Sequence, residues 1–196
     1  MMRMIHLSAA ALLVLLSACT QPALPEDHYY RLGGAAPKAG AGGTLSGIVE
    51  VNRFIASGLT ASRAIVYTDS VNAREVRAYH YHFWAEPPPI MLQNALVSYL
   101  RAANAAPTVV TPDMRVEPDF IVSGKIRRFE QVRGAAGKVN VELELSVKRS
   151  RDDKLILLKP YAVSVGTRGA TVGEAVTRIS QGINAIYAKF LSDIPR

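Results

Sequence analysis

The chain has 196 residues, of which 49% are hydrophobic, and it carries 23 Lys and Arg against 16 Asp and Glu, a formal net charge of +7. Its single cysteine excludes an intrachain disulfide. The basic balance by itself fits a nucleic-acid partner, an anionic membrane surface or an acidic protein partner, and it equally fits a charge that serves only solubility.

The first 18 residues predict a secretory signal peptide. Arg3 precedes an almost wholly apolar run from Leu7 to Leu16, which is the order of a basic start and an apolar core. A permanent membrane helix needs about 20 apolar residues, so this run is too short to be one. The segment then ends in Leu16-Ser17-Ala18-Cys19, which matches the lipobox of bacterial lipoproteins. We therefore expect cleavage before Cys19 and a diacylglyceryl group on its thiol.

The alternative is a plain signal peptide with an incidental cysteine. Lipidation explains the lone cysteine better, because a free exposed thiol is a liability in an oxidising compartment. Two acyl chains anchor a protein stably where one does not. The mature chain would keep 178 residues, since 196 − 18 = 178, enough for one domain with a sizeable core. An exported lipoprotein rarely meets nucleic acid, so no nucleic-acid partner is expected.

Residues 19–47 are expected to form a lipidated tether. Pro22 and Pro25 favour an extended start, and Tyr29-Tyr30-Arg31-Leu32 is a candidate short strand. The stretch from Gly33 to Gly47 holds six glycines and few large side chains. Such a stretch buries too little apolar surface to offset its ordering entropy, so we interpret it as a loop.

Residues 48–196 are expected to form the folded domain. Strand patterns rich in β-branched and aromatic residues occur at 48–51, 64–67 and 75–84. Pro87-Pro88-Pro89 ends the third strand, and proline is favourable in a first helical turn. Leu92, Leu96, Tyr99 and Ala103 then recur at helical spacing.

The second half of the domain predicts an antiparallel meander. The run 120–132 reads as a strand whose alternation shifts near Gly124, which suggests a bulge. A turn at 134–137 leads into 138–148, where apolar and polar residues alternate without exception, as in a strand with one face in the core. A second turn at 151–154 precedes a strand at 155–165.

The last element is an amphipathic helix. Thr171 and Glu174 have the spacing of a capping box. An apolar stripe follows at steps of four and three residues, and such a stripe needs a surface to cover. The sequence therefore predicts an α+β fold, a twisted antiparallel sheet with two helices packed on one face. The stripe consists of Val172, Val176, Ile179, Ile183, Ile186 and Phe190.

Catalytic signatures are weak. The glycines near Lys138 lack both P-loop spacing and a following helix, and no Gly-x-Ser-x-Gly motif occurs. His80 and His82 would share one strand face, but a zinc site needs at least a third protein ligand. Glu142 and Glu144 lie on a polar face, which argues for solvation. We expect no enzyme activity and no cofactor; a metal-dependent periplasmic enzyme using His80 and His82 remains the minor alternative.

Two basic clusters flank the meander strand at 138–148. They would lie at its opposite ends, so they are expected to form solvated rims, with docking at one end as the alternative. One holds Lys125, Arg127, Arg128, Arg133 and Lys138, and the other holds Lys148, Arg149, Arg151 and Lys154.

With the lipobox and the domain pattern in view, the chain resembles the ABC-type transport auxiliary lipoproteins, the PqiC-like group. The resemblance rests on Tyr29 to Leu32, on Ile48 to Val51, and on the run from Ala64 through Trp84 to Pro88, where a tryptophan closes a strand before a proline step. The Leu92, Leu96 and Leu100 pattern continues it. It covers most of 29–192, and the long loop at 33–47 departs from many members.

The resemblance implies a non-enzymatic accessory subunit that works beside an MCE-domain protein and an ABC permease and ATPase. Such systems move phospholipid or other hydrophobic cargo between the inner and outer membranes and support membrane integrity. Self-assembly and docking on the MCE protein are implied too. Thr20 follows the lipidated cysteine in place of an inner-membrane-retaining aspartate, so outer-membrane placement facing the periplasm is expected.

The corner around Trp84, Pro87 and Pro88, together with exposed strand edges, is the candidate partner contact. Ordinary core packing is the alternative for Trp84. A second functional class is a lipoprotein that plugs or chaperones an outer-membrane assembly complex, which would have a β-barrel partner in place of an MCE protein.

Overall fold

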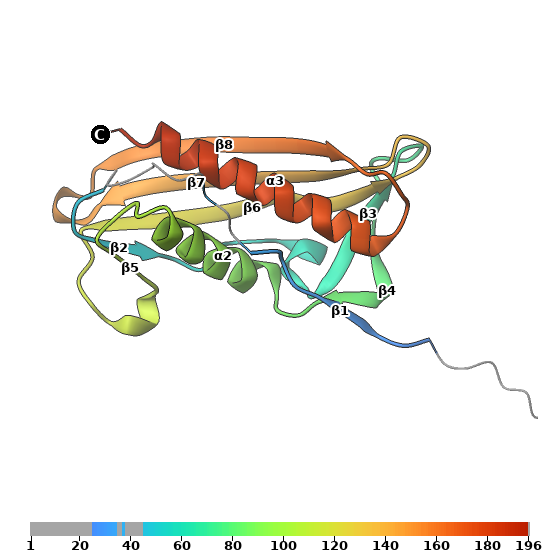
Figure 1. Cartoon of the computed structure of the whole chain (residues 1–196), viewed down its shortest axis with the longest axis horizontal. Coiled ribbons are helices and arrows are strands. Elements are labelled where there is room, and N and C mark those ends of the chain that lie inside the picture. Colours follow the sequence, from blue (N-terminus) through green and yellow to red (C-terminus); the bar gives the residue numbers. More distant parts are fainter. Residues whose placement is uncertain (1–24, 35–36, 38–44, 196) are drawn as a thin grey trace, which may run out of the picture.

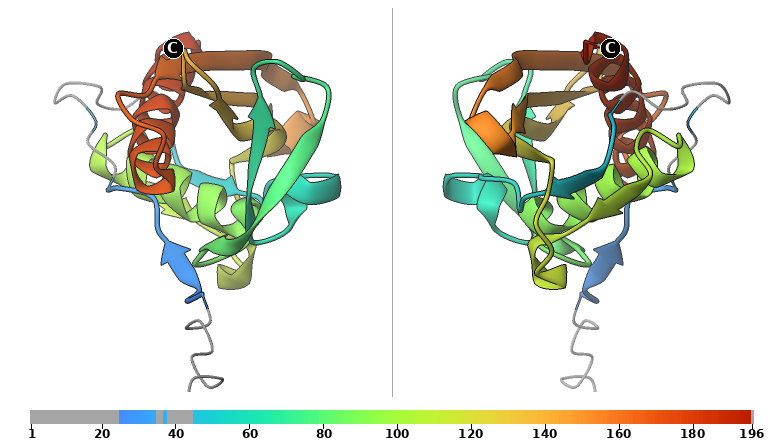
Figure 2. Two further views of the ribbon diagram at one scale, coloured as in Figure 1. Left: turned by 90° about the vertical axis from the view of Figure 1, so that its right-hand side faces the viewer. Right: turned by 90° about the vertical axis from the view of Figure 1, so that its left-hand side faces the viewer.

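In the computed structural model, residues 25–34, 37 and 45–195 are described. Their strands form one eight-stranded sheet that curls around two α-helices (Figures 1 and 2). The predicted α+β class, with both helices on one face of a twisted sheet, is confirmed. The elements in chain order are β1 (His28–Tyr30), β2 (Ile48–Val51), η2 (Gly58–Ala61), β3 (Ala64–Asp69), β4 (Val76–Trp84), α2 (Pro88–Ala102), β5 (Thr108–Val110), η3 (Pro112–Met114), β6 (Phe120–Arg133), β7 (Lys138–Arg149), η4 (Ser150–Asp152), β8 (Leu155–Gly166) and α3 (Val172–Asp193).

The β6–β7–β8 meander is antiparallel throughout, as the sequence predicts. Strand β7 lies in the middle and pairs along its length with both neighbours. Its alternation follows from its burial: one face is in the core, and the other carries the polar residues of the strand. The buried face consists of Val139, Val141, Leu143, Leu145 and Val147.

A bulge interrupts β6, but it lies beyond Gly124. The pairs Ile126–Leu143 and Arg128–Glu142 leave Arg127 as the extra residue. Gly124 has a different role, because a Cβ atom there would lie 2.6 Å from the ring of Phe54. The missing side chain lets Phe54, from the segment after β2, pack directly on β6.

The other half of the sheet is mixed, which the prediction of an antiparallel sheet did not include. Strands β2 and β3 both run parallel to β6, at its N-terminal and C-terminal parts respectively. Strand β5, which no pattern predicted, extends the sheet in parallel beside β2. Strand β1 runs parallel to β4. These pairings join segments separated by long connections, so no local turn signal in the sequence announces them.

Both helices pack inside the curl of the sheet (Figure 2). Helix α3 lies over β7 and β8, and α2 lies beside it over β2 and β5 (Figure 1). The hydroxyl of buried Tyr187 on α3 donates to the carbonyl of Leu92 on α2 at 2.9 Å, which ties the two helices. Every residue of the predicted α3 stripe is buried, so the stripe is confirmed as the core face.

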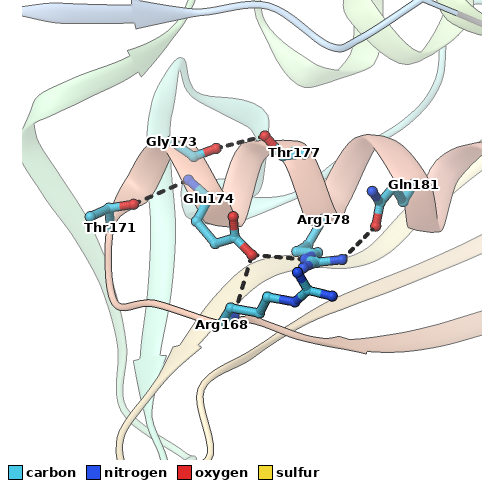
Figure 3. Close-up of polar contacts among 7 residues, drawn as sticks. All are labelled: Arg168, Thr171, Gly173, Glu174, Thr177, Arg178 and Gln181. Atoms are coloured by element: carbon cyan, nitrogen blue, oxygen red, sulfur yellow. Dashed lines mark hydrogen bonds and ion pairs between the residues drawn. The ribbon is translucent and has the colours of Figure 1, made fainter.

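The predicted capping box at the start of α3 is confirmed in one half (Figure 3). The Thr171 hydroxyl oxygen accepts the N–H of Glu174 at 3.3 Å. The Glu174 carboxylate instead accepts the N–H of Arg168, ahead of the helix, at 3.3 Å, and pairs with Arg178 Nε at 2.9 Å. These contacts lower the pKa of Glu174, and the hydrogen bond from the Arg168 N–H makes the largest contribution.

Candidate functional site

The corner between β4 and α2 is built around a buried tryptophan. The Trp84 side chain is 1% exposed, and its ring lies 5.0 Å from that of Phe129 on β6. Its backbone N–H donates to the Arg63 carbonyl at 2.7 Å, and Arg63 Nε donates to the Trp84 carbonyl at 3.1 Å. Pro88, the first residue of α2, is buried, and Pro87 is partly exposed. The environment of Trp84 matches the core-packing alternative, and partner contact at this corner stays a prediction.

An irregularity in β4 separates the two histidines that the sequence placed on one face. Between the pairs Ala64–Phe83 and Val66–Ala78, β3 advances two residues and β4 advances five. His80, on the extra stretch, is exposed, whereas His82 is half-buried. Strict alternation, the basis for placing both imidazoles together, therefore does not describe this strand.

His82 instead contacts residues of β1. Its ring stacks on that of His28 with centroids 5.0 Å apart, and its Nδ1 lies 2.9 Å from the Tyr30 hydroxyl oxygen. Tyr79 meets the same ring edge-on at 5.3 Å. Burial, and secondarily the nearby His28, lowers the pKa of His82, and burial raises the pKa of Tyr30. His28 falls in the segment that the sequence predicts as a tether, because the parallel pairing of β1 with β4 has no local signal in the sequence.

Among the described residues, no third metal ligand lies beside His28 and His82. Among the residues that the structure describes, no group of three or more His, Cys, Asp or Glu side chains is placed to hold a metal ion. The stacking of His28 on His82 and the hydrogen bond between His82 and the Tyr30 hydroxyl join the first strand to the sheet.

One basic cluster lies at the η4 end of the meander, whereas the other runs from the middle of β6 to the opposite end, and several members pair with acidic neighbours. Arg127 contacts Glu144 at 2.8 Å in the middle of the meander, and Arg149 contacts Asp152 at 2.7 Å at the η4 end. The hydrogen bond from Arg149 lowers the pKa of Asp152 to about 2. Such exposed pairs contribute little to stability and fit the solvated rims that the sequence predicts.

The described surface carries several open clefts, among them two of larger volume. One, of about 680 Å³, lies between the loop before β6 and the turn after β7, where Asp119 Oδ2 accepts the Ile48 N–H at 2.8 Å. The other, of about 490 Å³, lies between the segment after β1 and the outer side of α2, next to Leu32, Met91 and Ala95. The first cleft is lined largely by charged and polar residues, and the second by a mixture of apolar and polar residues.

The predicted lipid attachment site, Cys19, lies outside the described residues. The described helices include none with the length and apolar character needed to cross a bilayer.

Comparison with solved structures supports the fold. A protein from Xanthomonas campestris is 17% identical, with a TM-score of 0.72 over 83% of this chain and 92% of that one. An uncharacterised protein, also 17% identical, gives a TM-score of 0.68 over 87% and 99% of the two chains. PelC from Paraburkholderia phytofirmans, crystallised as a dodecamer, is 12% identical to this chain. The TM-score is 0.50, and the superposition covers 85% of this chain and 96% of PelC. At these identities the likeness concerns the fold.

Comparison of the sequence with protein families identifies one that spans this fold. No curated protein sequence gave a significant match. The family described as "ABC-type transport auxiliary lipoprotein component" matches residues 30–189, from the end of β1 to the last turns of α3. That range covers well over half of the 196 residues. The chain belongs to the family of ABC-type transport auxiliary lipoproteins.

Proposed function

We propose that this protein is the outer-membrane lipoprotein subunit of an MCE-type ABC lipid transport system, facing the periplasm and acting without catalysis. The observation that carries the proposal is the family match over residues 30–189, which names a lipoprotein auxiliary to ABC transport. The MCE partner follows from the PqiC-like pattern of Tyr29 to Leu32 and of the Trp84 to Pro88 corner. The subunit would link the transporter to the outer membrane and so support membrane integrity.

The anchor is proposed to be a lipidated Cys19, exposed by removal of residues 1–18, with residues 19–47 joining it to the domain. Growth with a clickable palmitate analogue should label the wild-type protein. Cys19→Ser should abolish labelling and leave a longer, unprocessed chain. Equal labelling of both proteins would contradict this attachment site.

Outer-membrane placement rests on Thr20 following the anchor cysteine. Density-gradient separation of the two membranes should place the wild-type protein in the outer-membrane fraction. Thr20→Asp should move it to the inner membrane without changing its lipidation. Wild-type protein in the inner membrane would contradict the placement.

The free edge of β8 is the proposed contact with a partner or with another copy. In the described part of the chain, this 12-residue strand pairs only with β7. Its unpaired main-chain groups can receive a further strand. PelC from Paraburkholderia phytofirmans forms a dodecamer in its crystal, which supports self-assembly as part of the proposal. Light scattering of the purified lipoprotein in detergent would give the number of copies, and a strict monomer would contradict self-assembly.

The deciding experiment is purification of the complex from membranes in mild detergent, followed by mass spectrometry. We expect an MCE-domain protein with its permease or ATPase. The control is a tagged, unrelated outer-membrane lipoprotein purified in parallel. Recovery of a β-barrel assembly protein instead would favour the plug or chaperone function, and neither partner under conditions that preserve known complexes would contradict both.

A further inference from the structure

The strand nearest the predicted anchor exposes an aromatic surface. Tyr29 on β1 is 57% exposed and stacks on Phe83 of β4, with ring centroids 5.7 Å apart. The guanidinium of Arg63 lies over the same ring at 5.2 Å, and Tyr81 is exposed further along β4. A tyrosine held between an apolar neighbour and a cation suits the headgroup region of a bilayer, where aromatic side chains are enriched.

A second apolar projection lies on the same side of the molecule. The loop containing η3 exposes Met114, at 60%, and Val116, and it is bracketed by Pro112 and Pro118. Backbone bonds from Met114 N–H to Thr111 and from Arg115 N–H to Pro112, both 3.1 Å, hold its turn. In all three ribbon views, β1 and the yellow-green η3 turn form the lower side, opposite β8 (Figures 1 and 2).

The length of chain between anchor and domain limits how far this side can be from the membrane. Eight residues, 20–27, lie between Cys19 and His28, the first residue of β1, so nine chain steps join the two. A fully extended chain covers at most about 3.3–3.6 Å per residue, so the separation is no more than about 30 Å. The side of the domain that carries β1 is therefore held close to the bilayer, and apolar side chains exposed there have a nearby apolar phase to enter.

We propose that the side formed by β1 and the η3 loop is a membrane-contact face that rests on the phospholipid bilayer through Tyr29 and Met114. This inference rests on the lipid anchor in the proposed function. The contact would fix the orientation of the domain, with β8 directed away from the membrane, which attachment at Cys19 alone would not do.

The charges on this face favour apolar contact over attraction to anionic lipid. The basic residues Arg31, Arg63 and Arg115 lie near β1 and on the η3 loop, and the acidic residues Glu26, Asp27, Asp113 and Glu117 lie in the same two places. Acidic side chains thus offset the basic ones, and surface attraction of this kind needs a basic excess. Contact depth is therefore expected to change little between low and high salt.

The test is a depth measurement with a spin label on the lipidated mature protein, reconstituted into vesicles of phosphatidylethanolamine and phosphatidylglycerol at a 3:1 ratio. Because Cys19 is the only cysteine and carries the lipid, Met114→Cys and Tyr29→Cys each supply a unique thiol. Val71→Cys, in the loop between β3 and β4, is the control, because Val71 is 94% exposed and lies away from both the β1–η3 side and the β8 edge. For each spin label, we would measure its accessibility to a water-soluble nickel complex and its accessibility to oxygen, which concentrates in lipid.

Labels replacing Met114 and Tyr29 should show several-fold lower nickel accessibility and higher oxygen accessibility than the Val71 control, at both low and high salt. If the protein floats with the vesicles but all three labels are equally open to nickel, the membrane-contact face is wrong while the anchor stands. A fall in both nickel and oxygen accessibility would indicate a protein contact and also overturn it. Wild-type protein that fails to float would overturn the anchor and, with it, this inference.

Discussion

The β6–β7–β8 meander and the edge formed by β1, β3 and β4 belong to one sheet but are specified differently. In the meander, successive strands pair with their neighbours in sequence, and β7 is buried on every second residue. At the other edge, β1 and β3 make parallel contacts with distant segments, and β4 carries the irregularity opposite Ile65. Local pattern thus specifies the first region, and long-range packing the second.

That difference has a physical cause. A hairpin turn places two antiparallel strands together at little loop-closure cost, so a correct alternation is enough to fix their register. A parallel pair needs a long connection, and its register depends on which side chains pack together across it. At the β4 edge those contacts are Trp84 with Phe129 and His82 with His28. Variants in the two regions should therefore fail in different ways.

The largest effect is expected from Trp84→Ala. Removing this buried ring leaves a cavity against Phe129 and should lower the free energy of unfolding by about 3–5 kcal/mol. Urea denaturation followed by circular dichroism measures it. Tyr81→Ala, on the same strand but exposed, is the control and should change stability far less. If Trp84→Ala kept full stability yet lost partner binding, the residue would be an interface residue.

Leu143→Ala tests the meander. The Leu143 side chain is fully buried at the centre of β7, so its truncation should cost about 2–5 kcal/mol. Ser146→Ala, on the opposite face of the same strand, should stay within about 0.5 kcal/mol. Similar losses for both variants in urea denaturation would contradict the assignment of the two faces.

Thr171→Ala tests the start of α3. Loss of the hydroxyl leaves the Glu174 N–H without its acceptor and should cost about 1 kcal/mol. Thr171→Ser keeps an oxygen at the cap and should retain most of the stability. Thermal unfolding of the three proteins, measured in parallel, decides this; an equal loss in both variants would contradict the capping role.

Acid should loosen β1 before it affects the meander. The pKa of His82 is lowered from its usual 6.5 by burial and by His28, so the unfolded chain binds this proton more readily. The stabilisation is full above about pH 6.5 and is lost as pH falls through the lowered pKa. Hydrogen exchange of residues 28–32, corrected for its intrinsic pH dependence, should therefore show weaker protection at pH 5 than at pH 7.5.

The control for that experiment is His82→Gln, which cannot gain a proton. Its β1 protection should be nearly the same at both pH values. A wild-type protein whose β1 protection does not change with pH, or a variant that keeps the wild-type change, would show that His82 is not the group responsible.

Individual residues show which features of the fold can be predicted from local sequence patterns. The buried face of an element can be predicted where burial imposes the period of that element on the sequence. This holds for the alternation from Val139 to Val147 in β7 and for the apolar stripe from Val172 to Phe190 in α3. Alternation is a weaker guide at His80 and His82, because the pairing of β4 with β3 is irregular there. It also missed β5, whose three residues are too short to show a period.

The sequence by itself determined the α+β class, the meander, both helices and their buried faces, and the resemblance that names the family. The lipobox at Cys19 likewise predicts the anchor from sequence alone. Tertiary structure decided that β1 pairs with β4, that Trp84 is in the core, and that Tyr29 and the η3 loop lie on one side. The spacing of apolar residues in the sequence indicates which face of a helix or strand is buried. Contacts between distant segments depend instead on how the whole chain packs.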